Sequence, residues 1–253
     1  MKSVLVKILL FSAILLSACN REDGGAAKAI AALPDVPASV AKPKVTKAQW
    51  LSAIDATFSA VNRRADGEGV STFLACFDKE NAPNCKVRLS GKRDEFRKLQ
   101  FFSAPLAEWN ANAPSKSAIR AYIALADCKD PVIALSPVFR GRSKWLFLEK
   151  FAIMADDSVI LERNFENHEV QRTQEYNELK EIATAVLIDS EVQAIRSLPR
   201  AQTVVIRLTG KNSYTTVDKK FALDFAQDLL RIIHGYDEFR RVNEKLGDLA
   251  CAA

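Results

Sequence analysis

The sequence predicts an α+β domain in which a mainly antiparallel sheet is covered by helices. Three observations lead to this class. Between residues 119 and 165, apolar segments of strand length follow one another across short polar turns, as antiparallel neighbours do. Amphipathic helical stripes flank this region at 47–63 and 218–235. An apolar content of 48%, with 14 phenylalanines, is ample for a packed core.

The chain begins with a short segment that is basic and then apolar. Lys2 and Lys7 accompany the largely apolar residues 4–16, a run of about 13 positions against the ~20 that a membrane-spanning helix needs. A basic start, a short apolar core and small residues at its end are typical of a secretory signal. The next residues, Leu-Ser-Ala-Cys at 16–19, resemble the lipobox of bacterial lipoproteins at every position.

This resemblance implies a lipid anchor at Cys19. Cleavage would leave Cys19 as the new N-terminus, carrying a thioether-linked diacylglycerol and an N-acyl chain such as palmitate. Two or more acyl chains hold a protein stably at a membrane. Asn20 stands where many lipoproteins retained at the inner membrane have aspartate, so the resemblance favours the outer membrane, facing the periplasm. A plain cleaved signal with an incidental cysteine is the alternative.

Three regions are therefore expected: a signal peptide at 1–18, a lipidated N-terminus and flexible linker at 19–45, and a single α+β domain at 46–253. The linker is rich in alanine, proline and glycine and has no apolar period, which is typical of a disordered tether. Without the two lysines of the signal, the formal net charge of +5 falls to about +3. This balance gives no support for a nucleic-acid partner.

The first elements of the domain are predicted from caps and periodicity. Thr46-x-x-Gln49 has the spacing of a capping box. Trp50, Ile54, Phe58 and Val61 then form one apolar stripe, which extends the helix to residue 63. The elements expected next are a short apolar segment at 70–77, a strand at 87–92, a helix at 96–102 and a mainly irregular stretch at 103–117.

The sheet is expected to hold four to six strands from 119–165 and 203–209. Residues 145–154 form the strongest strand prediction and meet 159–165 across a turn at 155–158. Both faces of this strand are apolar, which predicts a central position with Trp145, Phe147 and Leu148 buried. The remaining expectations are strands at 119–126 and 132–139, a helix or strand at 175–184, a helix at 188–198, and a long helix at 218–235 that Gly235 kinks or ends before a last short helix to 246.

Four cysteines of the domain form an even set in an exported chain, which predicts disulfide bonds. Cys76 and Cys85 are the favoured pair because a tight turn separates them, which leaves Cys128 with Cys251. The other two pairings remain alternatives. Because no Cys-x-x-Cys occurs and both histidines are remote, neither a metal nor a cofactor is expected.

Candidate catalytic residues are few. His168 follows a strand and Asp156 lies in a nearby turn, so the two are candidates for an acid–base cluster. Glu149 interrupts the apolar strand at 145–154 and is a candidate for a pocket beside Phe147 and Phe151. The simpler interpretations are a solvated histidine in a polar loop and a glutamate paired at the sheet margin.

Basic residues gather in two groups that an acidic partner or lipid headgroups would suit. The groups are Lys86, Arg88, Lys92, Arg93, Arg97 and Lys98, and Arg140, Arg142 and Lys144. Because Asp94 and Glu95 dilute the first group, an ordinary solvated face is the alternative.

Together these features favour an envelope lipoprotein that binds a protein or a cell-wall partner without catalysis. An immunity-type inhibitor, which neutralises toxins arriving at the envelope, is one such role. A small envelope hydrolase using Glu149, or His168 with Asp156, is the alternative. A deep pocket with convergent polar groups would favour the hydrolase, and a flat or apolar exposed patch the binding protein.

Overall fold

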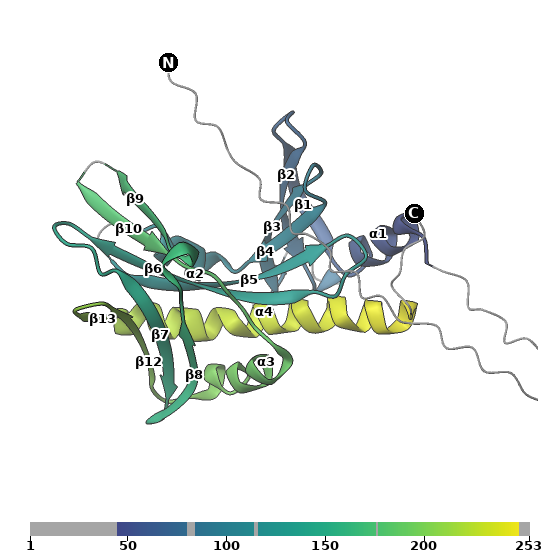
Figure 1. The fold of residues 1–253 in the computed structure, drawn as a ribbon. Helices are drawn as coiled ribbons and strands as arrows, with labels where there is room; N and C mark the ends of the chain where they lie inside the picture. The colour runs from purple at the N-terminus through teal and green to yellow at the C-terminus, as the bar shows by residue number, and fades with distance from the viewer. Residues whose placement is uncertain (1–44, 80–83, 114–115, 176, 248–253) are drawn as a thin grey trace, which may run out of the picture. The chain divides into compact units, whose positions relative to one another are not determined.

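The computed structural model describes residues 45–79, 84–113, 116–175 and 177–247. The predicted signal peptide and nearly all of the predicted linker lie outside these residues. Within them the α+β class is confirmed, because strands predominate and every strand pairing is antiparallel. Figure 1 shows two sheets and one long helix, α4, that lies against both of them.

The first sheet has nine strands in the order β1-β2-β3-β4-β5-β6-β10-β9, with β11 paired to β6. From β1 to β6 each strand pairs with the next one in the chain, so the sheet is built by successive hairpins. Its strands are β1 (Ser59–Ala65), β2 (Val70–Cys76), β3 (Arg88–Asp94), β4 (Leu99–Ser103), β5 (Ala118–Ala126), β6 (Val132–Gly141), β9 (Gln171–Glu175), β10 (Glu178–Ile182) and β11 (Ala185–Val186).

The second sheet has four strands in the order β13-β12-β7-β8. The predicted turn at 155–158 is confirmed, because β7 and β8 form a hairpin that closes at Ala155 and Ser158. The strand expected at 203–209 is present as β12. The strands of this sheet are β7 (Leu148–Ala155), β8 (Ser158–Asn164), β12 (Val204–Gly210) and β13 (Tyr214–Thr216).

The helices pack on one another and on the inner faces of the sheets. They are α1 (Lys47–Asp55), α2 (Pro105–Ala111), α3 (Asp189–Ile195) and α4 (Lys219–Leu246), with short 3-10 turns η2 (Asn167–Glu169) and η3 (Leu198–Arg200). The capping box of Thr46 and Gln49 is confirmed at the start of α1. Trp50 of α1 donates its indole N–H to the side-chain oxygen of Asn243 on α4, over 3.0 Å, so the two helices are joined by a buried hydrogen bond.

An aromatic cluster forms the core between the nine-stranded sheet and α4. It contains Phe58, Phe73, Phe77, Phe102 and Phe239. The ring centroids of Phe102 on β4 and Phe239 on α4 are 4.8 Å apart, and both side chains are fully buried. Offset and edge contacts of this kind add to the stabilisation from burial alone.

Two predicted helices are wrong in the first third of the domain. The helix expected at 47–63 ends at Asp55, and residues 59–65 form β1 instead. The helix expected at 96–102 is strand β4, with Phe102 buried in the core and Phe96 80% exposed at the hairpin tip. In both segments apolar residues recur by coincidence at intervals of three or four residues, as in a helix. The pairing of β1 with β2 and of β4 with β3 overrides this weak local preference for helix. The stretch expected to be irregular at 103–117 contains α2.

The strand predicted at 145–154 begins only at Leu148. Leu148 is buried as predicted, but Phe147 is 45% exposed and Trp145 only partly buried. The reason is a bulge, because Lys150 pairs with Thr209 and Leu148 with Gly210, which leaves Glu149 as an extra residue. The extra residue breaks the alternation of faces, so Leu148, and not Phe147, lies on the same face as the buried Phe151. The prediction that Phe147 is buried is therefore wrong.

The long C-terminal helix does not end or kink at Gly235. α4 runs without interruption from Lys219 to Leu246, a length of 28 residues. Gly235 is buried, and a Cβ there would lie 3.0 Å from Leu89 Cδ1 and 3.1 Å from Ile123 Cδ1. The glycine therefore favours close approach of the helix to the nine-stranded sheet, where a larger side chain would not fit.

Replacement of Gly235 by valine should lower the free energy of unfolding by about 1–3 kcal/mol, because its extra methyl groups overpack this contact. Alanine at the same position should stay within about 1 kcal/mol of wild type, because its higher helix propensity offsets the tight Cβ contact. Chemical denaturation measures both, with Gln227→Val at an exposed site of α4 as the control. Equal values for Gly235→Val and Gln227→Val would contradict the role of close approach.

Candidate functional site

The face of β1–β5 that points away from α4 forms a shallow hollow of about 680 Å³. Side chains alternate between the two faces of a strand. The inward positions of these strands carry the core, and the outward ones line the hollow. Its central floor is lined by the short side chains of Thr72, Ser90 and Ser103, which leave room that larger residues would fill. We call this surface, across β1–β5, the groove.

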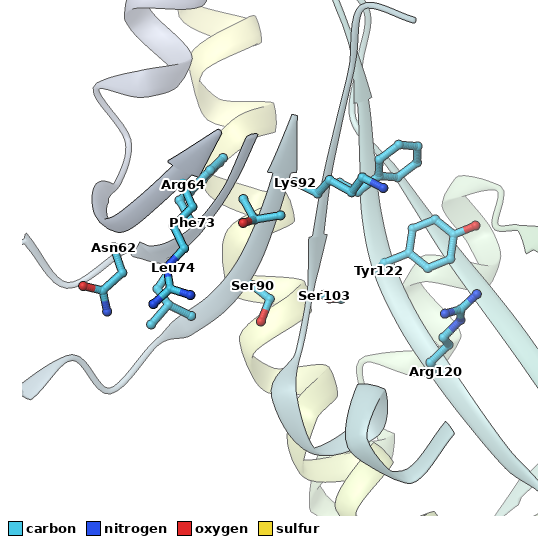
Figure 2. A pocket seen from close by; sticks show the side chains of 12 residues that line it. Asn62, Arg64, Phe73, Leu74, Ser90, Lys92, Ser103, Arg120 and Tyr122 are labelled. Carbon is cyan, nitrogen blue, oxygen red and sulfur yellow. The ribbon is translucent and has the colours of Figure 1, made fainter. Parts of the chain in front are cut away.

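Three cationic side chains line the groove on alternate strands. Arg64 comes from β1, Lys92 from β3 and Arg120 from β5. Figure 2 shows Lys92 between Arg64 and Arg120. Because adjacent strands lie about 4.8 Å apart, the three strands are set at intervals of about 10 Å. Among the described residues that line the groove there is no aspartate or glutamate, so its local charge is positive.

Aromatic and apolar groups occupy the spaces between these cations. The rings of Phe101 and Tyr122 form an edge-to-face pair with centroids 6.0 Å apart. Phe73 reaches the floor from the core side because its paired residue, Gly91, has no side chain. A Cβ at Gly91 would lie only 2.2 Å from the Phe73 ring, so the glycine is required there. The groove therefore offers cations, hydroxyl groups and aromatic surface together.

A carboxylate whose charge interacts with that of Lys92 is already engaged. Asp66, in the turn between β1 and β2, accepts hydrogen bonds from the backbone N–H groups of Glu68 and Val70 at 2.8 and 3.0 Å. These bonds lower the pKa of the Asp66 carboxyl below its ordinary value, with a smaller contribution from the charge of Lys92. Arg64 and Lys92 form no hydrogen bond or ion pair with any other described residue.

The structure divides the first predicted basic group. Lys92 lines the groove, and Arg88 lies on the same outward face of β3. Arg93 instead pairs with Glu95, and Arg97 lies 3.6 Å from Asp94. Of the six residues, only Lys92 therefore joins the cations of the groove.

In the second basic group, Arg140 is engaged in the fold. Arg140 is largely buried, forms an ion pair with Glu178 and donates two hydrogen bonds to the carbonyl of Ala111. Its charge is therefore used to fix α2 against β6 and β10.

Glu149 lines a second hollow, of about 560 Å³, at the junction of the two sheets. Phe147, Phe165, Arg172 and Lys211 also line this junction pocket. The predicted position of Glu149 beside Phe147 is therefore found, whereas Phe151 is buried in the core and does not line the pocket.

The structure does not bring Asp156 to Glu149, because the two residues stand at opposite ends of β7. Asp156 lies in the hairpin turn and accepts a 2.9 Å hydrogen bond from the backbone N–H of Thr203. His168 is exposed on η2, next to Asn167, which lines the junction pocket. The proposed cluster of His168 with Asp156 therefore lacks support from the fold.

A buried carboxylate, which the sequence did not single out, joins the two sheets. Glu181 of β10 is fully buried and accepts hydrogen bonds from the backbone N–H groups of Leu146, Phe147 and Leu148 at 2.6–2.8 Å. Arg172 donates to the same carboxylate over 3.2 Å. These bonds hold Phe147 at a φ of 54°, a left-handed conformation that is rare for an aromatic residue.

The cysteine pairing is confirmed as far as the described residues reach. Cys76 and Cys85 form the predicted disulfide, which joins the end of β2 to the segment before β3. Cys128 is also disulfide-bonded, so its partner is neither Cys76 nor Cys85. The predicted partner, Cys251, lies outside the described residues, and the link between Cys128 and Cys251 stays a prediction.

No protein-family model, no curated protein and no solved structure matches this chain. Within the described ranges, no group of three or more histidine, cysteine or acidic side chains is placed to hold a metal ion. In the same part of the chain, no helix is long and apolar enough to cross a membrane. The function is therefore inferred from the two hollows and their chemistry.

Proposed function

We propose that the protein is a lipid-anchored lipoprotein of the cell envelope whose domain binds a protein or cell-wall partner through the groove. The lipobox ending at Cys19 supports the anchor, and its pattern favours the outer membrane, facing the periplasm. An immunity-type inhibitor that captures an incoming toxin is one role that fits this arrangement.

The observation that carries the binding role is the charge of the groove. Arg64 and Lys92 are exposed and form no hydrogen bond or ion pair with another described residue, so they are available to an anionic group. The hollow is open and is floored by hydroxyl groups and aromatic rings, which suit recognition of a surface that carries both anionic and apolar groups. Complementary charge increases the rate of association and excludes partners of the wrong sign.

Charge reversal in the groove tests this role. The full-length chain carrying Lys92→Glu should capture at least about tenfold less partner from living cells by cross-linking than wild type, because a like charge then faces the anionic partner. Lys219→Glu, at an exposed site at the start of α4, is the matched control and should leave capture unchanged.

A complementation assay run beside the capture experiment distinguishes the binding protein from the alternative hydrolase. A binding protein should keep its activity in a complementation assay when His168→Ala is introduced. If Lys92→Glu captures as much partner as wild type, the groove is not the binding surface. If His168→Ala abolishes complementation while capture persists, the protein acts by catalysis.

A further inference from the structure

The junction pocket carries an inference that does not depend on the groove. Its walls come from the start of β7, the end of β8, η2, Arg172 of β9 and the residue after β12. The volume of about 560 Å³ lies within the range of about 300–1,000 Å³ that is usual for small-molecule sites. The pocket is thus large enough for a compact organic ligand.

Four charged side chains line this pocket, Glu149, Glu166, Arg172 and Lys211, and among them the opposite charges of Glu149 and Lys211 do not neutralise each other. Glu149 is exposed at the bulge of β7, and Lys211 follows the last residue of the neighbouring strand β12. Neither side chain forms a hydrogen bond or ion pair with the other or with any other described residue. An exposed ion pair contributes little even where it forms, so both charges are available to a ligand at little cost.

The backbone holds these two residues in fixed places. The carbonyl of Glu149 accepts a 2.7 Å hydrogen bond from the N–H of Phe165, and the carbonyl of Phe147 accepts a 3.2 Å bond from the N–H of Lys211. Glu181 fixes the N–H groups on either side of Phe147, as described above. A site on such a fixed frame loses little conformational freedom when a ligand binds.

Two aromatic rings and a second cation also line the pocket. The Phe147 ring is half-exposed, and the guanidinium of Arg172 lies 5.6 Å from its centroid. Asn167 accepts a 2.8 Å hydrogen bond from Arg172, so the cation is held in position over the ring. Phe165 is buried at the base of the pocket and stacks on Phe151, with centroids 5.7 Å apart. An apolar group that enters the pocket therefore meets aromatic surface.

We propose that the junction pocket binds a zwitterionic small molecule of the size of a dipeptide. The carboxylate of the ligand would lie against Lys211 and Arg172, and its ammonium group against Glu149. An apolar side chain would pack on Phe147. Such a ligand satisfies both open charges, whereas a molecule with a single charge satisfies only one of them.

Titration with a dipeptide and its blocked forms tests this proposal. The probe is alanyl-phenylalanine, in its L,L and D,D forms, added to the lipidated full-length chain in detergent and followed by calorimetry. The N-acetyl form lacks the ammonium group, and the amide form lacks the carboxylate. Each should bind at least about tenfold more weakly than the free dipeptide of the preferred hand, because a charge-assisted contact is lost.

The matching variants assign each charge to its residue. Lys211→Gln should weaken binding of the free dipeptide by about the same factor as amidation and should have little further effect on the amide. Glu149→Gln should weaken binding of the free dipeptide by about the same factor as N-acetylation and should have little further effect on the N-acetyl form. Glu162→Gln, at an exposed carboxylate of β8, is the control and should change nothing.

Two results would overturn the proposal. One is the absence of saturable binding of either free dipeptide up to about 10 mM, a concentration that reaches even weak sites. The other is equal affinity of wild type for the free and blocked forms, which would show that the pocket does not recognise the paired charges. Both variants alter exposed side chains, so thermal unfolding should confirm that they remain folded.

Discussion

Replacement of Glu181 by alanine is expected to lower the free energy of unfolding by about 3–5 kcal/mol, the usual cost of leaving a buried charge network without one partner. The carboxylate accepts three backbone N–H groups and the Arg172 side chain, and it is 0% exposed. A hydrogen bond to a charged group contributes about 1.5–3 kcal/mol. Alanine would leave the donors of Leu146 and Leu148 buried without an acceptor.

The loss should also disconnect the two sheets. The segment that Glu181 holds follows β6 of the nine-stranded sheet and leads directly into β7 of the four-stranded sheet. Glu181→Gln keeps the shape but points an N–H₂ group at one side of the donors, so it should still cost about 1–3 kcal/mol. The left-handed conformation of Phe147 should relax in both variants, because the surrounding contacts no longer enforce it.

Denaturation by urea with a spectroscopic readout measures these values. The matched control is Glu162→Ala, which removes an exposed carboxylate that lies 3.3 Å from Lys150 on the neighbouring strand. Surface pairs of this kind contribute at most about 1 kcal/mol. If Glu181→Ala costs no more than Glu162→Ala, the carboxylate does not hold the sheets together.

The parts of the fold that the sequence predicts are those with a strong apolar pattern of their own. The segments 119–126, 132–139 and 159–165 contain runs of apolar residues bounded by turns, and they form β5, β6 and β8. The stripe of α4 and the capping box of α1 were recognised for the same reason, since each depends on residues within one or two turns.

In the first third of the domain, β1 and β4 were not recognised because these strands are short and their pattern is ambiguous. β1 exposes six of its seven residues, so no apolar face marks it as a strand. In β4, Leu99 and Phe102 have the spacing of a helical turn, although they point to opposite faces of the sheet. The neighbouring strands decide that β1 and β4 are strands, and this pairing cannot be predicted from the sequence of one segment alone.

In the candidate sites too, residues that stand out locally were recognised, and residues that strand pairing brings together were not. Lys92 and Glu149 were singled out in the sequence because they stood out locally, one in a basic group and one in an apolar strand. Arg64 and Arg120 were missed, since only the pairing of β1–β5 places them on one face. Alternation along 118–126 could have placed Arg120 and Tyr122 on the same side.

Glu181 was missed for a further reason. It lies at an inward position of β10, in a segment whose class the sequence left open, and a carboxylate there has no local explanation. Its donors come from residues 146–148, far away in the chain. A charged residue at an inward strand position is the one signal that would have pointed to such a contact.

Replacement of Cys19 by serine is expected to release the protein from the membrane fraction or to leave it unprocessed and without a lipid. Serine has no thiol for the thioether, so neither the diacylglycerol nor the N-acyl chain would be added. Each buried CH₂ of an acyl chain contributes about 0.8 kcal/mol, and two or more chains give a stable anchor. Their loss should therefore exceed the effect of any single substitution in the folded domain.

Cell fractionation and metabolic labelling with an acyl-chain analogue measure this outcome together. Asn20→Asp is the informative control, because it should keep the label and the membrane association but shift the protein towards the inner membrane, as the lipoprotein resemblance implies. The predicted linker, 19–45, would span roughly 28 Å as a flexible chain, so the groove would be free to reach a partner above the lipid headgroups. Unchanged fractionation of Cys19→Ser, with undiminished label, would mean that the acyl chains are attached at another residue and that the lipobox pattern is incidental.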